Sequence, residues 1–242
     1  MLATEMACMP GMIQWHRETT YLPLTSGWLF TMPSSVISLM RGDGKGSVGT
    51  WCSPLRYYLN YDNLISEGYR TENSFDYETS FNITPQSRVP IVVDSNIKIA
   101  TWGFFPDWLK KQKNSKPLFN TRWETIREKK TFQSAYRKSR CLVPISGWYE
   151  WKTENDDKNP YYFYTDEPVV YAAGLYWNRS NGDVEFSIIT QEAYGDLANV
   201  HNRTPLLLNN QYKNHWLSDG DIDNLYHEIT ESKKKIVDFH RV

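Results

Sequence analysis

Cysteine is scarce in this 242-residue sequence, and its three cysteines, Cys8, Cys52 and Cys141, show no Cys-x-x-Cys spacing. An odd number of cysteines cannot pair completely, and the ligand pairs of a structural zinc site are missing. We therefore expect a reducing compartment, no disulfide framework and no metal. A chain of this length can bury a sufficient core without such cross-links.

Long apolar runs are also missing. The best candidate for a membrane span, residues 28–40, is shorter than the roughly 18 apolar residues that a span needs, and Pro33 interrupts it. We expect a soluble, intracellular monomer that has no membrane partner and needs no organic cofactor.

Net charge is close to zero, at −1, but the charges are segregated. Residues 110–140 contain eleven Lys or Arg against Glu124 and Glu128, a local charge of +9 that leaves −10 for the rest of the chain. A segregated positive stretch is typical of proteins that contact phosphate groups, although a solvated lysine-rich helix face gives the same pattern. Charge alone leaves both interpretations open.

The first 50 residues differ from the rest, with little periodicity and a glycine cluster at 42–49. The cluster contains Gly-x-Gly-x-x-Gly, but Trp51-Cys-Ser-Pro54 follows where a dinucleotide site requires a helix. We expect a flexible or mis-assigned leader over residues 1–50 and a single domain over residues 51–242.

Short strands bounded by Gly, Pro, Asn or Asp dominate from residue 88 onward. The expected strands are 89–94, 97–101, 141–145, 147–152, 161–164, 169–176, 184–190, 206–208 and 235–242. The expected helices are 121–130, 132–140, 210–217 and 221–229. This pattern predicts an α+β fold with a mixed, mostly antiparallel barrel-like sheet and short flanking helices.

Five short segments combine aromatic rings, amide and guanidinium donors, a carboxylate and a histidine. They are Phe81-Asn-Ile-Thr-Pro85, Trp102-Gly-Phe-Phe-Pro-Asp-Trp108, Phe119-Asn-Thr-Arg-Trp-Glu-Thr125, Ser146-Gly-Trp-Tyr-Glu-Trp151 and Val200-His-Asn-Arg-Thr-Pro205. Side chains of these types can hold a phosphodiester strand and move protons beside it.

Two residues in these segments are candidates for proton transfer. On a strand, Trp148, Glu150 and Lys152 share one face, so Glu150 lies beside an indole. Partial removal from water favours the protonated carboxyl group, which can then donate as well as accept protons, although a surface glutamate paired with a lysine fits equally. His201 lies in a polar turn, where an imidazole titrates near pH ~6.5 or merely caps the turn.

Asn120 and Arg122 stand two residues apart, so in an extended segment their side chains point the same way. An amide can hold a sugar or aldehyde oxygen, while a guanidinium can bind phosphate in a two-pronged contact.

Together and in this order, the segments resemble the SRAP family, the SOS-response-associated peptidases, which bind single-stranded DNA and shield abasic sites. The resemblance covers residues 81–217. It implies catalytic roles for Cys52, Asn120, Glu150 and His201. It implies DNA contacts by Asn82, Pro85, Trp108, Arg122, Lys130 and Arg203, with Lys130 standing where the family has arginine and Trp108 stacking on a base.

In the family the reactive cysteine is exposed at the mature N-terminus. A free α-amine has a pKa of about 7.7, so its neutral form can attack an aldehyde to give an imine. The neighbouring thiolate then closes a thiazolidine ring. Cys52 is the best positional match for this residue.

The sequence departs from the family around Cys52. Trp51 precedes it, and Ser53-Pro54 follows it where the family has Gly-Arg. Self-cleavage before Cys52, a wrongly assigned leader and a degenerate copy without covalent chemistry all remain open. A second departure is the C-terminal end, which we expect to be shorter than the family pattern.

The sequence therefore predicts an abasic-site processing protein that binds single-stranded DNA and cross-links to it through Cys52, provided that the amine is exposed. Two alternatives stay open: a noncovalent single-stranded-DNA-binding module, and a cysteine peptidase in which a thiol and His201 act on peptide bonds, including those of the chain itself.

Overall fold

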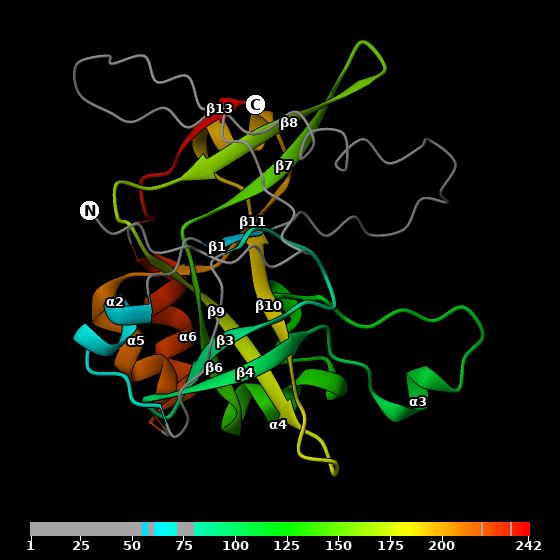
Figure 1. Ribbon diagram of the computed structural model, residues 1–242, viewed down its shortest axis with the longest axis vertical. Helices are drawn as coiled ribbons and strands as arrows, with labels where there is room; N and C mark the ends of the chain where they lie inside the picture. Colours follow the sequence, from blue (N-terminus) through cyan, green and yellow to red (C-terminus); the bar gives the residue numbers. More distant parts are fainter. Residues whose placement is uncertain (1–54, 58–60, 72–79, 219, 233) are drawn as a thin grey trace, which may run out of the picture. The chain divides into compact units, whose positions relative to one another are not determined.

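The computed structural model describes residues 55–57, 61–71, 80–218, 220–232 and 234–242 (Figure 1). All of them belong to one compact unit, Ser47–Val242. The expected leader, together with Cys8 and Cys52, lies outside the described residues, so the domain boundary near residue 50 stays a prediction.

The larger sheet closes on itself. Its strands are β3 (Arg88–Val93), β4 (Asn96–Trp102), β5 (Asn120–Arg122), β6 (Arg140–Ile145), β9 (Val170–Asn178), β10 (Val184–Glu192), β11 (Arg203–Pro205) and β12 (Leu207–Leu208). The sheet runs β4-β3-β6-β9, and β10 pairs with both β4 and β9, the two ends of that run. The expected barrel-like sheet is confirmed, with β10 parallel to β4 and β5 and every other pairing antiparallel.

A second sheet has the order β13-β8-β7-β1-β2 (Figure 1). Its strands are β1 (Leu55–Tyr57), β2 (Ser80–Ile83), β7 (Gly147–Glu154), β8 (Asp157–Tyr164) and β13 (Asp238–Arg241). The chain passes from β6 of the barrel to β7 through Ser146 alone, which ties the two sheets together. Asn155 and Asp156 join β7 to β8 with positive φ at both positions, the geometry of a tight two-residue hairpin.

Short helices flank the sheets. They are α2 (Tyr61–Ser66), α3 (Asp107–Lys110), α4 (Lys130–Lys138), α5 (Asn210–Leu217) and α6 (Ile222–Glu231), with 3-10 turns η1 (Trp123–Thr125) and η2 (Gly195–Asn199). The helix expected over 121–130 is wrong, because this stretch contains the end of β5 and then η1. Thr121 pairs with Ile189 of β10, and its hydroxyl lies 2.9 Å from that of Ser187, so sheet pairing overrides the local helical spacing.

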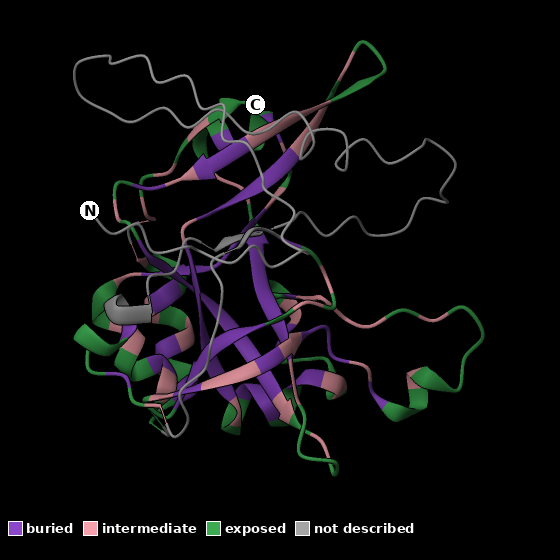
Figure 2. Ribbon diagram, viewed as in Figure 1, coloured by how far each residue is buried: buried purple, intermediate pink, exposed green. Residues whose placement is uncertain are grey.

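The buried side chains lie mainly on the barrel strands (Figure 2). Two glycines of the sequence segments allow close packing there. Gly103 has a φ of 131°, and a Cβ atom on it would lie 2.8 Å from the ring of Phe119. A Cβ atom on Gly147 would lie 2.4 Å from the carbonyl oxygen of Phe163 in β8. Both positions therefore require glycine.

Arg140 is a buried cation that joins two helix ends. Its guanidinium donates to the carbonyl oxygens of Tyr136 and Arg137 at the end of α4, each at 2.7 Å. It also donates to the carbonyl of Trp216, at 2.6 Å, and to that of Ser218 at the end of α5. Carbonyl groups at helix C-termini lack intrahelical donors, and the guanidinium of Arg140 supplies hydrogen-bond donors to them.

We expect Arg140→Met to lower the free energy of unfolding by about 2 to 4 kcal/mol, because several buried carbonyl groups would lose their donors. Urea denaturation measures this loss. Arg137→Met, at an exposed position near the end of α4, is the matched control and should change stability little. Equal effects of the two substitutions would contradict the structural role of Arg140.

Candidate functional site

Glu150 and His201 meet although 51 positions separate them. Glu150 is buried on β7, and His201 follows η2. The Oε2 atom of Glu150 lies 3.5 Å from Nδ1 of His201. Lys152, on the same face of β7, pairs instead with Glu154 at 2.9 Å. Glu150 is thus a buried carboxylate beside an imidazole and not a surface glutamate.

The His201 ring is held by the backbone two residues further on. The N–H of Arg203 donates to Nδ1 at 3.2 Å, and the carbonyl oxygen of Arg203 lies 3.1 Å from the same atom. One donor and two oxygens, including that of Glu150, therefore surround Nδ1. These contacts hold the imidazole beside the carboxylate.

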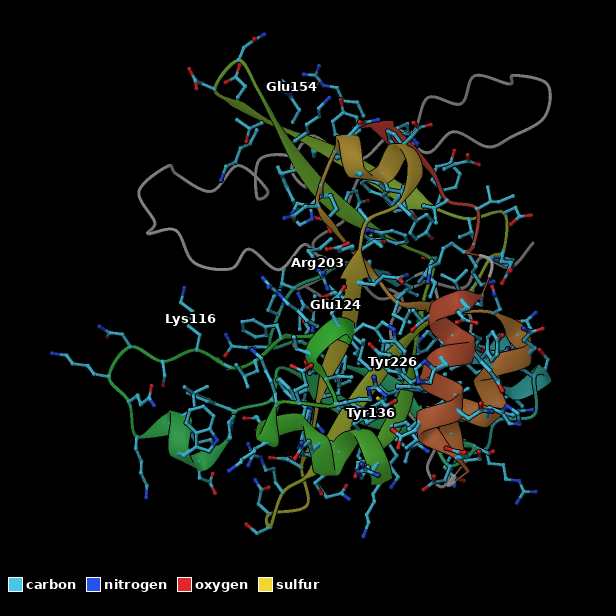
Figure 3. All side chains as sticks on the ribbon, turned by 180° about the vertical axis from the view of Figure 1, so that it is seen from behind. Lys116, Glu124, Tyr136, Glu154, Arg203 and Tyr226 are labelled. Carbon is cyan, nitrogen blue, oxygen red and sulfur yellow. The ribbon has the colours of Figure 1, made fainter. Side chains whose placement is uncertain are left out.

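Arg203 forms a two-pronged ion pair with Glu124, and the two residues are labelled close together in Figure 3. Its two terminal nitrogens donate to the carboxylate oxygens at 2.9 and 3.0 Å. The sequence predicts no role for Glu124. It shows this residue in Asn-Thr-Arg-Trp-Glu, but it gives no sign that the fold brings Glu124 close to Arg203.

The pKa of Glu124 lies below its usual value. Partial burial raises this pKa, but the hydrogen bonds from Arg203, from the backbone of Glu124 itself and from the backbone N–H of Glu192 outweigh it, together with the charge of Arg203. Glu124 is therefore a fixed anion at neutral pH.

Asn120 and Arg122 lie on β5, which runs parallel to β10. Asn120 pairs with Ile188 and Arg122 with Thr190. The side chain of Arg122 is exposed and that of Asn120 is half-buried, and strand geometry directs both to the same side. On the other edge of β10, Arg203 pairs with Glu192. The end of β10 thus brings the Asn120 and His201 segments together.

Trp108 and Lys130 lie on separate elements. Trp108 belongs to α3, with 53% of its surface exposed, in a loop that projects from the barrel (Figure 1). Figure 3 shows Lys116 of the same loop well away from Glu124 and Arg203. Lys130 is exposed at the first residue of α4. Pro85 is half-buried in the turn after β2, and Asn82 lies within β2.

The base of the projecting loop is fixed. The ring of Phe104 stacks on Trp177 with centroids 3.7 Å apart, and its backbone bridges to Leu118. Arg179 pairs with Glu185 at 2.5 Å, and the Glu185 carboxylate accepts the backbone N–H of Phe105 at 3.0 Å. The loop therefore presents Trp108 from a rigid support.

Ten of the eleven basic residues of the +9 stretch are exposed, and the eleventh is Arg140. They belong to the projecting loop, β5, the segment after η1, and α4. The interpretation as one solvated helix face is therefore wrong, because the charges are spread over several elements.

Cys141 is fully buried, and this burial raises the pKa of its thiol. Within the described residues it is the only free cysteine, and its environment is that of a core residue. In the same part of the chain, no group of three His, Cys, Asp or Glu could hold a metal. None of the described helices is long and apolar enough to cross a membrane.

A cavity of about 470 Å³ lies apart from these residues, between the end of α2, the turn before β9 and the start of α5. Glu67 and Lys213 at its wall pair with each other at 2.8 Å. Its lining includes none of the candidate site residues.

Known proteins are similar to this chain in fold and in sequence. A solved structure of a protein from Bacteroides thetaiotaomicron superposes with a TM-score of 0.63 at 26% identity, covering 75% of this chain and 87% of that one. YoaM of Bacillus subtilis, named an abasic site processing protein, is 28% identical over 180 residues, which cover 69% of this chain and 79% of YoaM. HMCES of Xenopus tropicalis, with the same descriptive name, is 27% identical over 194 residues, which cover 64% of this chain and 58% of HMCES.

The family model described as SOS response associated peptidase (SRAP) matches residues 52–242. The chain therefore belongs to the SRAP family.

The lowered pKa of Glu124 predicts a pH-dependent contribution to stability. Because the folded-state pKa is below that of the unfolded chain, the contribution is present above the usual carboxyl pKa of about 4.3 and is lost as pH falls through the folded value. We expect the stability difference between the wild type and Glu124→Gln to be largest near pH 7 and to shrink in acid. Chemical denaturation over a pH series measures it, and a difference that grows in acid would contradict this assignment.

Proposed function

We propose that this protein processes abasic sites in single-stranded DNA and forms a thiazolidine cross-link through Cys52 when the α-amine of that residue is free. The observation that carries the proposal is the 3.5 Å approach of the buried Glu150 carboxylate to His201. Membership of the SRAP family and the printed names of YoaM and HMCES support it.

The proposed reaction has two steps, imine formation and ring closure. The neutral amine of Cys52 adds to the aldehyde carbon of the ring-opened abasic sugar, and loss of water gives an imine. The thiolate then adds to the imine carbon, and the nitrogen takes up a proton, so the ring closes without an oxidant or reductant. The loss of water and the protonation of the nitrogen both need an adjacent acid or base.

Glu150 is assigned the proton transfers of imine formation and ring closure. A carboxyl group beside an imidazole can give a proton to the departing hydroxyl group and then take one back. His201 is assigned the protons of the sugar oxygen and of the reverse reaction. The amide of Asn120, half-buried on β5, is assigned to the orientation of the sugar.

The strand is proposed to lie over exposed basic and aromatic side chains. Arg122 and Lys130 supply positive charge for phosphates, and the exposed ring of Trp108 supplies a stacking surface for a base. Asn82 and Pro85 remain predicted contacts of the same strand. These contacts read no base edge, so binding is expected to tolerate any sequence.

We expect salt-sensitive binding to single strands, with Arg122→Ala weakening affinity by about 1 to 3 kcal/mol because a charged hydrogen bond to phosphate is lost. Fluorescence anisotropy over a salt series measures the affinity and its salt slope. Arg88→Ala, an exposed arginine outside the +9 stretch, is the control and should have little effect. Binding that ignores salt, or that is confined to duplex, counts against the proposal.

A chain that begins at Cys52 after initiator removal is expected to form a denaturation-resistant adduct with an abasic single-stranded oligonucleotide. The full-length chain is expected to be inert, since an internal Cys52 nitrogen is an amide without a basic lone pair. A denaturing gel compares the two, with Cys52→Ala as the control. If neither chain gives a Cys52-dependent adduct but both bind DNA, the noncovalent module is the better interpretation.

In the same assay, Glu150→Gln is expected to slow the formation of the adduct while leaving noncovalent affinity nearly unchanged, because the amide keeps the size of the side chain but cannot transfer its proton. A gel time course gives the rate and anisotropy gives the affinity. An unchanged rate would remove Glu150 from the mechanism.

A further inference from the structure

The projecting loop, residues 105–117, has little packing of its own (Figure 1). None of the four residues of α3, the helix within this loop, is buried. The backbone N–H groups of Leu109 and Lys110 donate to the carbonyl oxygen of Pro106, which belongs to the same loop. The direction in which the loop carries Trp108 therefore depends on the contacts at its base.

An arginine and a glutamate at the β9–β10 hairpin hold both backbone polar groups of Phe105. The N–H of Phe105 donates to Oε2 of Glu185 at 3.0 Å, and its carbonyl oxygen accepts a hydrogen bond from the guanidinium of Arg179. Arg179 also donates to Oε2 of Glu185 at 2.5 Å, and its Nη1 atom lies 3.6 Å from Oδ1 of Asp107, the first residue of α3. We call Arg179 and Glu185 the clamp.

The clamp is fixed to the barrel. The N–H of Arg179 donates to the carbonyl oxygen of Asp183 at 2.8 Å, and its own carbonyl oxygen accepts the N–H of Gly182 at 3.0 Å. Glu185 lies on β10 directly opposite Trp177 of β9. The side chains of Arg179 and Glu185 are only 18% and 16% exposed. The clamp therefore keeps the position of the barrel strands, and the loop is attached to it.

We infer that Arg179 and Glu185 are positioning residues for Trp108, because they set the direction of the projecting loop and so the place where its exposed indole meets a base. A ring that is already held in one direction loses less conformational freedom on stacking than a ring on a free loop. The inference rests on the proposed function for its effect on DNA binding, but the state of Trp108 can be observed without DNA.

The test compares Arg179→Gln with Arg88→Gln in the full chain. Both variants lose one positive charge, but Arg88 is exposed on β3 and lies outside the clamp and the +9 stretch. We expect Arg179→Gln to bind an unmodified single-stranded oligonucleotide about threefold to tenfold more weakly than Arg88→Gln, because the freed loop must be ordered on binding. Fluorescence anisotropy measures both Kd values, and equal values overturn the inference.

Fluorine NMR follows the Trp108 ring without DNA. In protein labelled with 5-fluorotryptophan, the signal of Trp108 is assigned by its loss in Trp108→Phe. This signal should become narrower in Arg179→Gln, because the ring moves faster on a freed loop, and stay unchanged in Arg88→Gln. A signal that is unchanged in both variants overturns the inference whatever the Kd. If the wild type does not bind DNA, the proposed function fails, while this comparison still decides the role of the clamp.

A double-mutant cycle separates positioning from a direct contact of Arg179 with phosphate. If Arg179 acts through Trp108, Arg179→Gln should change the Kd less than twofold when Trp108→Ala is already present. The attraction of the exposed lysines of the loop tolerates loop movement, since it acts over about 8 to 10 Å. A loss of equal size in both backgrounds, with a salt slope shallower by about one unit, indicates a phosphate contact and overturns the inference.

A second variant keeps the test decisive if Arg179→Gln fails to fold. Arg179→Lys retains the charge, but an ammonium group lacks the planar fork that reaches Phe105, Glu185 and Asp107 together. We expect the same narrowing of the Trp108 signal and the same loss of effect in the Trp108→Ala background. A wild-type signal together with a wild-type Kd in Arg179→Lys overturns the inference.

Discussion

The site depends on the hydrogen bonding of both edges of β10. At the start of this strand, β4 and β9 pair with its two edges; further along, β5 and β11 replace them. A strand paired on both sides along its length cannot shift its register without breaking several ladders at once. The segments that carry Asn120 and Arg203 thus hold fixed positions, and the second sheet brings Glu150 to the same place.

This arrangement explains why the candidate site needs the closed barrel. The Asn120, Glu150 and His201 segments are far apart in sequence, and strand pairing together with the Glu150–His201 contact brings them together. Loops alone would allow the carboxylate and imidazole to separate by more than proton transfer tolerates. Gly103 and Gly147 contribute indirectly, because each lets a strand approach Phe119 or β8 more closely than a side chain would allow.

Much of the fold was predictable from local patterns, because Gly, Pro, Asn and Asp bound short runs of strand-forming residues, and barrel strands such as β6 are buried along their whole length. The shared face of Trp148, Glu150 and Lys152 followed from the two-residue period of a strand. The helix expected over residues 121–130 was wrong because pairing with β10 and burial of Trp123 decided its structure. The Glu124–Arg203 pair could not be predicted either, since its partners lie 79 positions apart and only the barrel juxtaposes them.

A carboxylate beside a surface proposed to bind a polyanion needs a physical reason. Glu124 offsets the charge of Arg203, and exposed groups such as Arg122 carry positive charge on the neighbouring strand. Attraction can be supplied by any of the ten exposed basic residues, because it acts over about 8 to 10 Å at physiological ionic strength. An imidazole nitrogen, by contrast, is held in place by direct contacts and not by charges at a distance. The ten exposed cations can therefore attract a polyanion even where Glu124 offsets the charge of Arg203.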